Sequence, residues 1–311
     1  MSTILVTGGA GFIGSHLVTA LVEGGHRVRV LDDLSSGRRE NLAHLGDRFE
    51  WMEGDVRDVK TCRRACEGVE FVFHQAAIPS VPRSVERPEV SHEVNVTGTL
   101  HLLRAAVEAK VRRFIYAGSS SVYGDSDVSP KHEGLRPDPL SPYAVQKHAG
   151  ETYARAFFVC YGLETISLRY FNVFGPRQDP HSDYAAAIPA FVTALLRGEP
   201  PTVFGDGEQT RDFTPVANVV QANLLAMQVE RTEGPAVNVA CGRGISVLEV
   251  IHVLNRLLGT EVRPRHAPPR PGDVRHSTAD ISLARRLLGY EPKVGFEEGL
   301  HAAIDYYRSI T

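Results

Sequence analysis

Cysteine and long apolar runs are scarce in this sequence. Only four cysteines occur among 311 residues, and none belongs to a C-x-x-C pair or to a histidine cluster with zinc-ligand spacing. This scarcity excludes a disulfide-built scaffold and predicts reduced thiols and no metal site. No apolar run approaches the roughly 18 residues of a membrane-spanning helix, and no signal-peptide pattern precedes the first apolar segment. We therefore expect a cytoplasmic protein that is not embedded in a membrane.

Excess charge of either sign is also missing. The net charge is -3, which gives no basic field to attract nucleic acid or an anionic lipid surface. The hydrophobic fraction of 42% and the charged fraction of 23% are typical of globular proteins. The length suits roughly two domains of about 150 residues each. These values predict a protein that acts on small molecules.

Short apolar, β-branched segments alternate with amphipathic ones from the first residues onward. A strand at 3–7, a helix at 11–23 and a strand at 27–32 form the first unit, and further strands are expected at 49–53, 71–76, 113–117 and 165–170. Such alternation predicts an α/β fold of the Rossmann type, with a doubly wound parallel sheet covered by helices on both faces.

The pattern changes after Gly175, where proline and glycine become frequent. Helices are expected at 184–197, 216–229 and 247–258, and a short strand at 237–240. We interpret residues 1–175 as a dinucleotide-binding domain and 176–311 mainly as a smaller mixed α/β lobe that binds substrate. A segment near 236–240 is expected to return to the first sheet. Because ligands of open α/β sheets bind beyond the carboxyl ends of the strands, we expect the substrate between the lobes.

A glycine motif, TGGAGFIG, links the first strand to the first helix. Gly8, Gly11 and Gly14 suit a tight turn, a close approach of a pyrophosphate and close helix packing, respectively. Asp32 follows Gly14 by 18 positions, where a carboxylate can bind ribose hydroxyls and repel a 2'-phosphate, so NAD is favoured over NADP. Asp55 could meet the adenine or cap the following helix, and the two interpretations are compatible.

A second motif places Tyr143 and Lys147 at the start of an expected helix. The i,i+4 spacing puts both side chains on one face, where the ammonium can favour the phenolate form of the tyrosine. A serine run, Ser119 to Ser121, follows an apolar strand and begins 24 residues before Tyr143. Its hydroxyls are expected at the reactive end of the cofactor. Together the two motifs indicate proton-transfer chemistry at the mouth of the cleft.

These motifs resemble those of a known family. TGGAGFIG, GDVRD, HQAA, NVTGT, the serine run, YAVQK and LRYFNVFGPRQ occur in the order and spacing typical of extended short-chain dehydrogenases/reductases. Within that superfamily the sequence is most similar to nucleotide-sugar 4-epimerases such as UDP-glucose 4-epimerase. The resemblance extends from Thr3 to about Tyr306, which is nearly the whole chain.

The resemblance implies roles for individual residues. Tyr143 would be the acid/base for the sugar O4, Lys147 would hold the nicotinamide ribose and lower the pKa of Tyr143, and Ser119 would hydrogen-bond the same hydroxyl, with Ser120 as a possible assistant whose rank stays open. The implied contacts with NAD are Gly8, Gly11, Phe12, Ile13, Gly14, Asp32, Ser36, Asp55, Val56, Ala76, Asn95, Tyr143, Lys147 and Tyr170. The implied contacts with the UDP-sugar are Ser80, Arg83, Ser119, Ser121, Asn172, Arg211, Arg270, Asp273 and Ser277.

Two departures from related families bear on the substrate. Nucleotide-sugar 4,6-dehydratases place an Asp-Glu pair where this chain has Ser120 and Ser121, so dehydration is disfavoured. Ser277 occupies the position of a gatekeeper that is bulky in enzymes confined to glucose and galactose. Together with the SVPRS segment at 80–84, this small residue implies that UDP-GlcNAc and UDP-GalNAc are accepted beside UDP-Glc and UDP-Gal.

Other interpretations stay open at this point. A UDP-glucuronate decarboxylase or a nucleotide-sugar reductase would use the same motifs, and a catalytically silent NAD-binding regulator would keep only the fold. The resemblance also implies a homodimer built on the helices near 95–109 and 143–158. The apolar surface of the first of these helices is wider than one narrow stripe, because it includes Leu100, Leu103, Ala106 and Val107. Burial within a monomer explains the same pattern. Arg38 and Arg39 are expected in a solvated loop.

Overall fold

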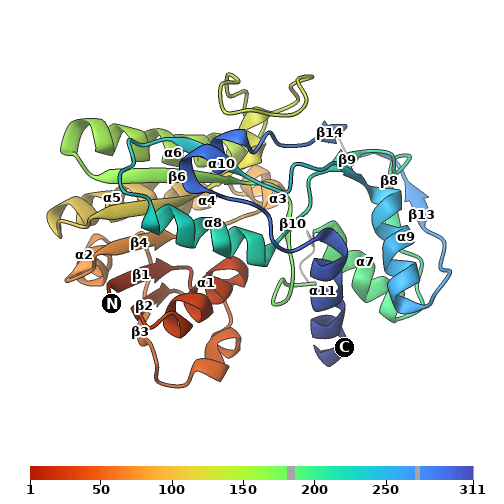
Figure 1. Cartoon of the computed structure of the whole chain (residues 1–311), viewed down its shortest axis with the longest axis horizontal. Helices are drawn as coiled ribbons and strands as arrows, with labels where there is room; N and C mark the ends of the chain where they lie inside the picture. The colour runs from red at the N-terminus through yellow and green to blue at the C-terminus, as the bar shows by residue number, and fades with distance from the viewer. Residues whose placement is uncertain (181–185, 270–273, 311) are drawn as a thin grey trace.

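The computed structural model describes residues 1–180, 186–269 and 274–310, and it consists of a large sheet-based lobe and a smaller helical lobe (Figure 1). The large lobe is built on seven parallel strands in the order β11-β6-β5-β4-β1-β2-β3. Their bounds are β1 Thr3–Thr7, β2 Arg27–Asp32, β3 Glu50–Glu53, β4 Phe71–His74, β5 Arg113–Ser119, β6 Glu164–Tyr170 and β11 Ala236–Val239. The predicted α/β fold with a doubly wound parallel sheet is confirmed.

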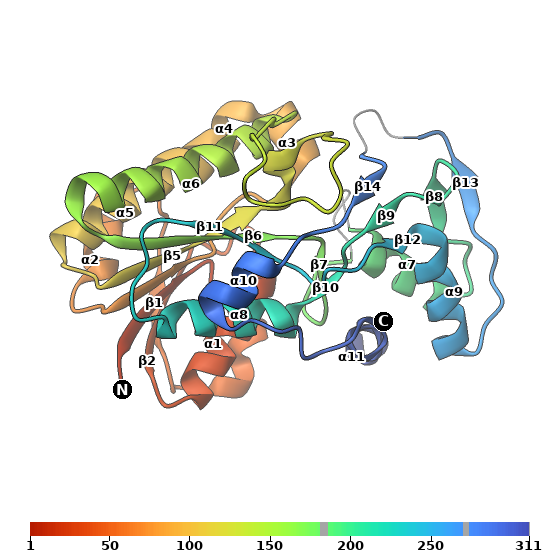
Figure 2. The same cartoon turned by 45° about the horizontal axis from the view of Figure 1, so that its top comes forward.

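Helices cover both faces of this sheet, as Figure 2 shows. One face is covered by α1 (Phe12–Glu23), α8 (Val216–Gln228) and α10 (Ser282–Leu288), and the other by α2 (Val59–Cys66), α5 (Thr99–Glu108) and α6 (Pro142–Tyr161). The central strands are mostly apolar because both of their faces are buried; all four residues of β4 are inaccessible or nearly so. Shorter elements complete this lobe: η1 Arg39–Leu45, α3 Val81–Glu86, α4 Pro88–His92, the π-helical η2 Glu93–Gly98 and η3 Ser120–Tyr123.

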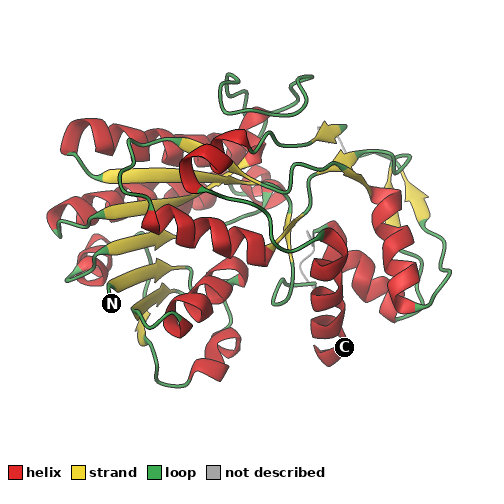
Figure 3. Ribbon diagram, in the orientation of Figure 1, coloured by secondary structure: helices red, strands yellow, loops and turns green. Residues whose placement is uncertain are grey.

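The smaller lobe has its own apolar core between three helices and short strands (Figure 3). The helices are α7 (Ala187–Leu196), α9 (Val247–Leu258) and α11 (Phe296–Ile310). Its small sheets are β12-β9-β14, β13-β8 and β10-β7, with bounds β7 Val173–Phe174, β8 Thr202–Phe204, β9 Thr210–Arg211, β10 Thr214–Pro215, β12 Ile245–Ser246, β13 Arg265–Ala267 and β14 His276–Ser277. In the described part of the chain, no helix has the length and apolarity needed to cross a bilayer.

Two differences from the expected elements have physical causes. Strand β5 continues to Ser119, two residues past the expected end, because its pairing with β6 extends to the register pair Ser119 and Tyr170. The register of this pair places both residues at the same edge of the sheet. Helix α1 begins at Phe12 rather than Gly11, because Gly11 is extended and serves as the N-cap.

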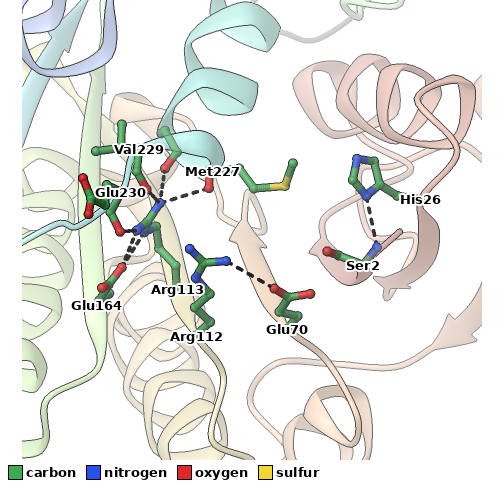
Figure 4. Close-up of polar contacts among 10 residues, drawn as sticks. Ser2, His26, Glu70, Arg112, Arg113, Glu164, Met227, Val229 and Glu230 are labelled. Carbon is green, nitrogen blue, oxygen red and sulfur yellow. Dashed lines mark hydrogen bonds and ion pairs between the residues drawn. The ribbon is translucent and has the colours of Figure 1, made fainter.

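A buried arginine holds the end of α8 within the large lobe (Figure 4). Arg113, at the start of β5, is fully buried and pairs with Glu164 of β6. Its guanidinium also donates to the backbone oxygens of Met227 at 3.0 Å and Val229 at 2.6 Å. A cation at the carboxyl end of a helix stabilises it, so Arg113 holds α8 against the sheet.

Candidate active site

A single large cleft lies beyond the carboxyl ends of the strands. Its volume is about 1450 Å³, which exceeds the roughly 300–1,000 Å³ of a site for one small ligand. The strand order reverses between β1 and β4, and this switch point opens into the cleft. The size and place of the cleft therefore suit a dinucleotide and a second ligand together.

The glycine turn after β1 forms one wall of the cleft. Gly8 has φ of +63°, and a Cβ there would lie 2.7 Å from the backbone nitrogen of Ala76. A Cβ on Gly14 would lie 2.0 Å from the oxygen of Gly8, so neither position tolerates a side chain. Gly11 caps α1 without a side-chain hydrogen bond, which leaves the first N–H groups of the helix facing the cleft. Phe12 and Ile13 line the same wall.

Asp32, at the end of β2, holds its carboxylate at the cleft. One oxygen accepts a hydrogen bond from the nitrogen of Ala10 and the other from the nitrogen of Leu34, both at 2.9 Å. Burial raises the pKa of Asp32, and the two backbone donors oppose that rise. Ser36 lies nearby in the lining. The glycine cradle and this carboxylate fit a dinucleotide whose ribose carries free hydroxyls.

Asp55 does not cap α2, and its expected contact with the adenine stays a prediction. Its carboxylate accepts hydrogen bonds from the backbone and side chain of Arg57, both at 2.8 Å, and it lies outside the cleft lining. The cap of α2 is Asp58, which directly precedes the first helical residue and accepts from the nitrogens of Lys60 and Thr61. The capping interpretation of Asp55 is therefore wrong, whereas its neighbour Val56 does line the cleft.

Asn95, expected to contact the cofactor, is buried behind the cleft wall instead. Its side-chain oxygen accepts from the nitrogen of Ile78 at 2.8 Å, and its amide nitrogen donates to the oxygen of Ile78 at 3.2 Å and to Gln146 at 2.9 Å. All of these bonds are internal to the protein. Asn95 therefore shapes the segment after β4, of which Ala76 and Ser80 line the cleft.

Tyr143 and Lys147 stand on the first two turns of α6, on one face as predicted. Ser141 caps this helix by accepting from the nitrogen of Ala144, and the nitrogen of Tyr143 donates to the hydroxyl of Ser84 at 3.0 Å. The Lys147 ammonium donates to the oxygen of Ala117 at 2.9 Å and lies 6.0 Å from the centre of the Tyr143 ring. Both residues line the cleft.

Burial dominates the electrostatics of this pair. It lowers the pKa of Lys147 to about 8, because an ammonium loses hydration in the protein interior. It also raises the pKa of Tyr143, an effect that a hydrogen bond from Ser119 opposes. Lys147 does not contribute to the shift of the Tyr143 pKa, so the expected lowering of that pKa by the ammonium, which donates to Ala117, is not found.

The serine run bends away from β5 into η3 at the base of the cleft. The Ser119 and Ser121 hydroxyls lie 2.9 Å apart, and the nitrogen of Ser121 donates to the Ser119 hydroxyl. Ser119, Ser120 and Ser121 all line the cleft. Ser119 is the one that hydrogen-bonds Tyr143, which favours it over Ser120 as the partner of that phenol.

The remaining expected residues reach the cleft from several different segments. Tyr170 directs its hydroxyl to Gln75 and Asn223, and it lines the cleft with Asn172, which has φ of +29°. Arg211 and Ser277 come from the small lobe and also line it. Ser80 and Arg83 belong to α3, where Ser80 caps the helix by accepting from the nitrogen of Arg83. Arg270 and Asp273 lie outside the described residues.

Three further lining residues were not among the expected site residues, although one of them, Arg177, lies within the LRYFNVFGPRQ motif. Arg177 (φ +64°), Asp179 and Tyr306 reach the cleft from the turn after β7 and from α11. Asp179 pairs with Arg38 at 3.3 Å at the rim of the cleft, where the Arg38 side chain stays 54% exposed, as expected of a solvated loop. Because these partners are more than a hundred residues apart in sequence, periodicity and local spacing carry no signal for the contact.

Comparison with known proteins identifies the family. A profile described as "NAD dependent epimerase/dehydratase family" matches residues 4–240. The chain belongs to this family. A UDP-glucose 4-epimerase of Mycolicibacterium smegmatis is 41% identical, with 98% of each chain covered. The cofactor of this NAD dependent epimerase/dehydratase is NAD, in agreement with the glycine cradle and Asp32.

Two solved structures are similar over almost the whole chain of this family member. One is a UDP-glucose 4-epimerase of Thermotoga maritima with UDP-glucose, 42% identical, with a TM-score of 0.94 and 99% of each chain covered. The other is a UDP-N-acetylglucosamine 4-epimerase of Methanobrevibacter ruminantium in complex with UDP-N-acetylmuramic acid, 38% identical, with a TM-score of 0.96 and 100% and 99% covered. The likeness to both includes the sheet and the small lobe.

Proposed function

We propose that this protein is a UDP-hexose 4-epimerase that interconverts UDP-glucose with UDP-galactose and UDP-GlcNAc with UDP-GalNAc. The observation that carries the proposal is the Tyr143 phenol, hydrogen-bonded to Ser119 and close to Lys147, in a cleft that also contains a dinucleotide cradle. The named relatives that span the chain are 4-epimerases of nucleotide sugars. An NAD-dependent nucleotide-sugar 4-epimerase is the general class, and the four sugars are the specific proposal.

The residues of the chain supply binding and proton transfer. The glycine cradle and Asp32 would hold NAD, which would supply reversible hydride transfer at C4 of the sugar, so that the overall reaction is redox-neutral. Tyr143 accepts the O4 proton as the hydride leaves and gives it back when the hydride returns. Ser119 orients that hydroxyl, and Ser120 lies within the same lining. The Lys147 ammonium, 6.0 Å from the centre of the Tyr143 ring, favours the phenolate that must be present before Tyr143 can accept this proton.

The small lobe carries the features that favour a UDP-sugar. Arg211 provides a guanidinium, the group that best matches a diphosphate, from a strand that faces the cleft. Ser277 lies opposite Arg211 in the pairing of β14 with β9, where a small side chain leaves room for an N-acetyl group. Arg270 and Asp273 remain proposed ligands of the UDP group on the resemblance alone.

A homodimer formed on α5 and α6 is part of the proposal. Helix α6 leaves Val145, Tyr153 and Val159 exposed, and Val159 retains 69% of its surface. Apolar side chains on an exposed helix face are stabilised when a second copy covers them. Light scattering is expected to give a dimer for the natural protein, and a shift toward monomer for Val159→Asp. A natural protein that is monomeric at micromolar concentration would contradict this part.

The decisive experiment is product analysis without added reductant. The purified protein is incubated separately with UDP-galactose, UDP-GalNAc and UDP-glucuronate, and the nucleotide sugars are separated by anion exchange. Conversion of the first two to their gluco epimers supports the proposal. Epimerisation of UDP-glucuronate alone would identify the enzyme as a UDP-glucuronate 4-epimerase. Release of CO2 would indicate a decarboxylase. A net requirement for NADH would indicate a reductase. NAD binding with no turnover would indicate the silent regulator.

A substitution at Ser277 tests whether this residue determines which sugars are accepted. Ser277→Tyr is expected to lose at least ten-fold more kcat/KM on UDP-GalNAc than on UDP-galactose, because the larger ring fills the space proposed for the N-acetyl group. Equal losses on both sugars would contradict the role of Ser277 and leave the 4-epimerase assignment intact.

A further inference from the structure

Asp212 is a buried carboxylate for which the proposed mechanism has no use. It directly follows Arg211 at the end of β9 and is completely inaccessible to solvent. One carboxylate oxygen accepts from the nitrogen of Cys241 at 2.9 Å. The other accepts from the nitrogens of Gly242 at 2.9 Å and Ala279 at 3.2 Å. A buried charge stabilised by several backbone donors is a rigid anchor, because moving it would leave the carboxylate or the donors unpaired.

Asp212 lies where the three strands of the small sheet β12-β9-β14 end. Strand β9 is central, with β12 antiparallel on one side and β14 parallel on the other. Arg211 is the register partner of both Ile245 and Ser277, and the strand pairing on both sides ends there. One residue further on, the Asp212 side chain bonds to segments continuous with each neighbouring strand. The side chain thus adds bonds to both neighbouring segments just past the last register pair of β9.

Asp212 also forms hydrogen bonds to the backbone at Ser277 and two residues after it. Its backbone nitrogen donates to the oxygen of Ser277 at 2.8 Å, while its carboxylate holds the nitrogen of Ala279, two residues later. The path of the chain past Ser277 is therefore fixed at two points by the residue next to Arg211. A shift of Asp212 would move the guanidinium and the serine relative to each other.

We propose that Asp212 is a positioning residue for the UDP-sugar: it fixes the register of Ser277 against Arg211, and so sets both the affinity for the diphosphate and the choice between plain and N-acetylated sugars. This inference rests on the proposed function and deepens it. Asp212 acts through its two neighbours, and its carboxylate does not itself bind the ligand. Its loss should therefore weaken substrate binding and alter selectivity, while the NAD half of the cleft is unaffected.

The test compares Asp212→Asn with Asp206→Asn. Asparagine keeps the shape but turns one acceptor into an N–H donor that faces backbone N–H groups. Asp206 is a suitable control because it lies on the exposed turn before β9, where it pairs with Arg275 in solvent. Three quantities are measured on the NAD-loaded protein: the Kd of UDP by calorimetry, the bound NAD, and the ratio of kcat/KM for UDP-GalNAc and UDP-galactose.

Asp212→Asn is expected to raise the Kd of UDP at least ten-fold and to change the sugar ratio at least five-fold, with bound NAD as in the natural protein. Asp206→Asn should leave all three values within two-fold. A folded Asp212→Asn protein with an unchanged Kd and ratio would overturn the inference. If that variant does not fold, Asp212→Glu, which keeps the charge but displaces it by one methylene, decides by the same criteria. A natural protein that neither binds UDP nor converts either sugar would refute the proposed function instead.

Discussion

The ammonium of Lys147 donates a hydrogen bond to the backbone oxygen of Ala117, 30 residues earlier in the chain. This bond anchors the lysine at the end of β5, beside the serine run, before any ligand is bound. It is the nearest acceptor that the buried cation has, and burial lowers the pKa of Lys147 from its ordinary value near 10.5 to about 8. The cation is therefore held at a cost in stability.

Replacing Lys147 should stabilise the cofactor-free protein while abolishing its activity. The pKa of Lys147 is lower in the folded protein than in the unfolded chain. Below pH 8 the lysine is charged in both states, so the full desolvation cost opposes folding. Between pH 8 and 10.5 the folded protein loses the proton first, so its stability rises with pH. Lys147→Met removes this cost, worth up to about 3 kcal/mol at about 1.4 kcal/mol per pKa unit. Urea unfolding at pH 7 and pH 10 measures the difference in free energy of unfolding between the variant and the natural protein. The variant should gain more stability at pH 7 than at pH 10. A variant less stable than the natural protein at pH 7 would contradict the expectation.

Tyr143→Phe should reduce kcat at least about a thousand-fold without loss of bound NAD, since a general acid/base typically contributes about 10²–10⁴. Tyr153→Phe is the matched control, because Tyr153 stands on the same helix with 37% of its surface exposed. The comparison requires epimerisation rates and the absorbance of bound cofactor. A Tyr143→Phe protein with unchanged biological activity would favour the regulator.

Asn95→Leu should destabilise the protein by about 2–4 kcal/mol, because it leaves the buried backbone groups of Ile78 and the Gln146 side chain without their partner. The KM for the UDP-sugar should rise as well, since Ile78 lines the cleft. Removing both side chains in Asn95→Leu/Gln146→Leu should cost less than the sum of the single changes. Strictly additive free energies of unfolding would show that the Asn95–Gln146 hydrogen bond contributes nothing.

Gly14→Ala should abolish NAD retention, because its Cβ would lie 2.0 Å from the oxygen of Gly8 and force the turn open. Gly295→Ala is the control; a Cβ there meets no atom within 4 Å. Bound NAD is measured after gel filtration. Equal NAD contents in the two variants would contradict the need for a close approach at Gly14.

The sequence predicted the fold and the cleft far better than it predicted the roles of individual polar residues. Strand β2 has the expected bounds because its short β-branched, largely buried pattern is readable locally. Tyr143 and Lys147 share a face because helical spacing alone decides it. Asn95 and Asp55 were placed at the cofactor by resemblance, but their side-chain partners depend on Ile78 and Arg57, which tertiary packing brings into reach. The pair Arg38 and Asp179 depends on how two distant loops meet, which no local pattern encodes.

The return of Ala236–Val239 to the edge of the large sheet makes the two lobes dependent on each other for folding. A chain cut after Gly175 would keep the glycine turn, Tyr143 and Lys147, but it would expose the backbone of β6 along the edge that β11 covers. Unpaired N–H and C=O groups at such an edge invite pairing between molecules and aggregation. The cofactor-binding half is therefore not a portable module: in evolution or in engineering, exchanging the sugar-binding lobe requires a replacement that also supplies the seventh strand.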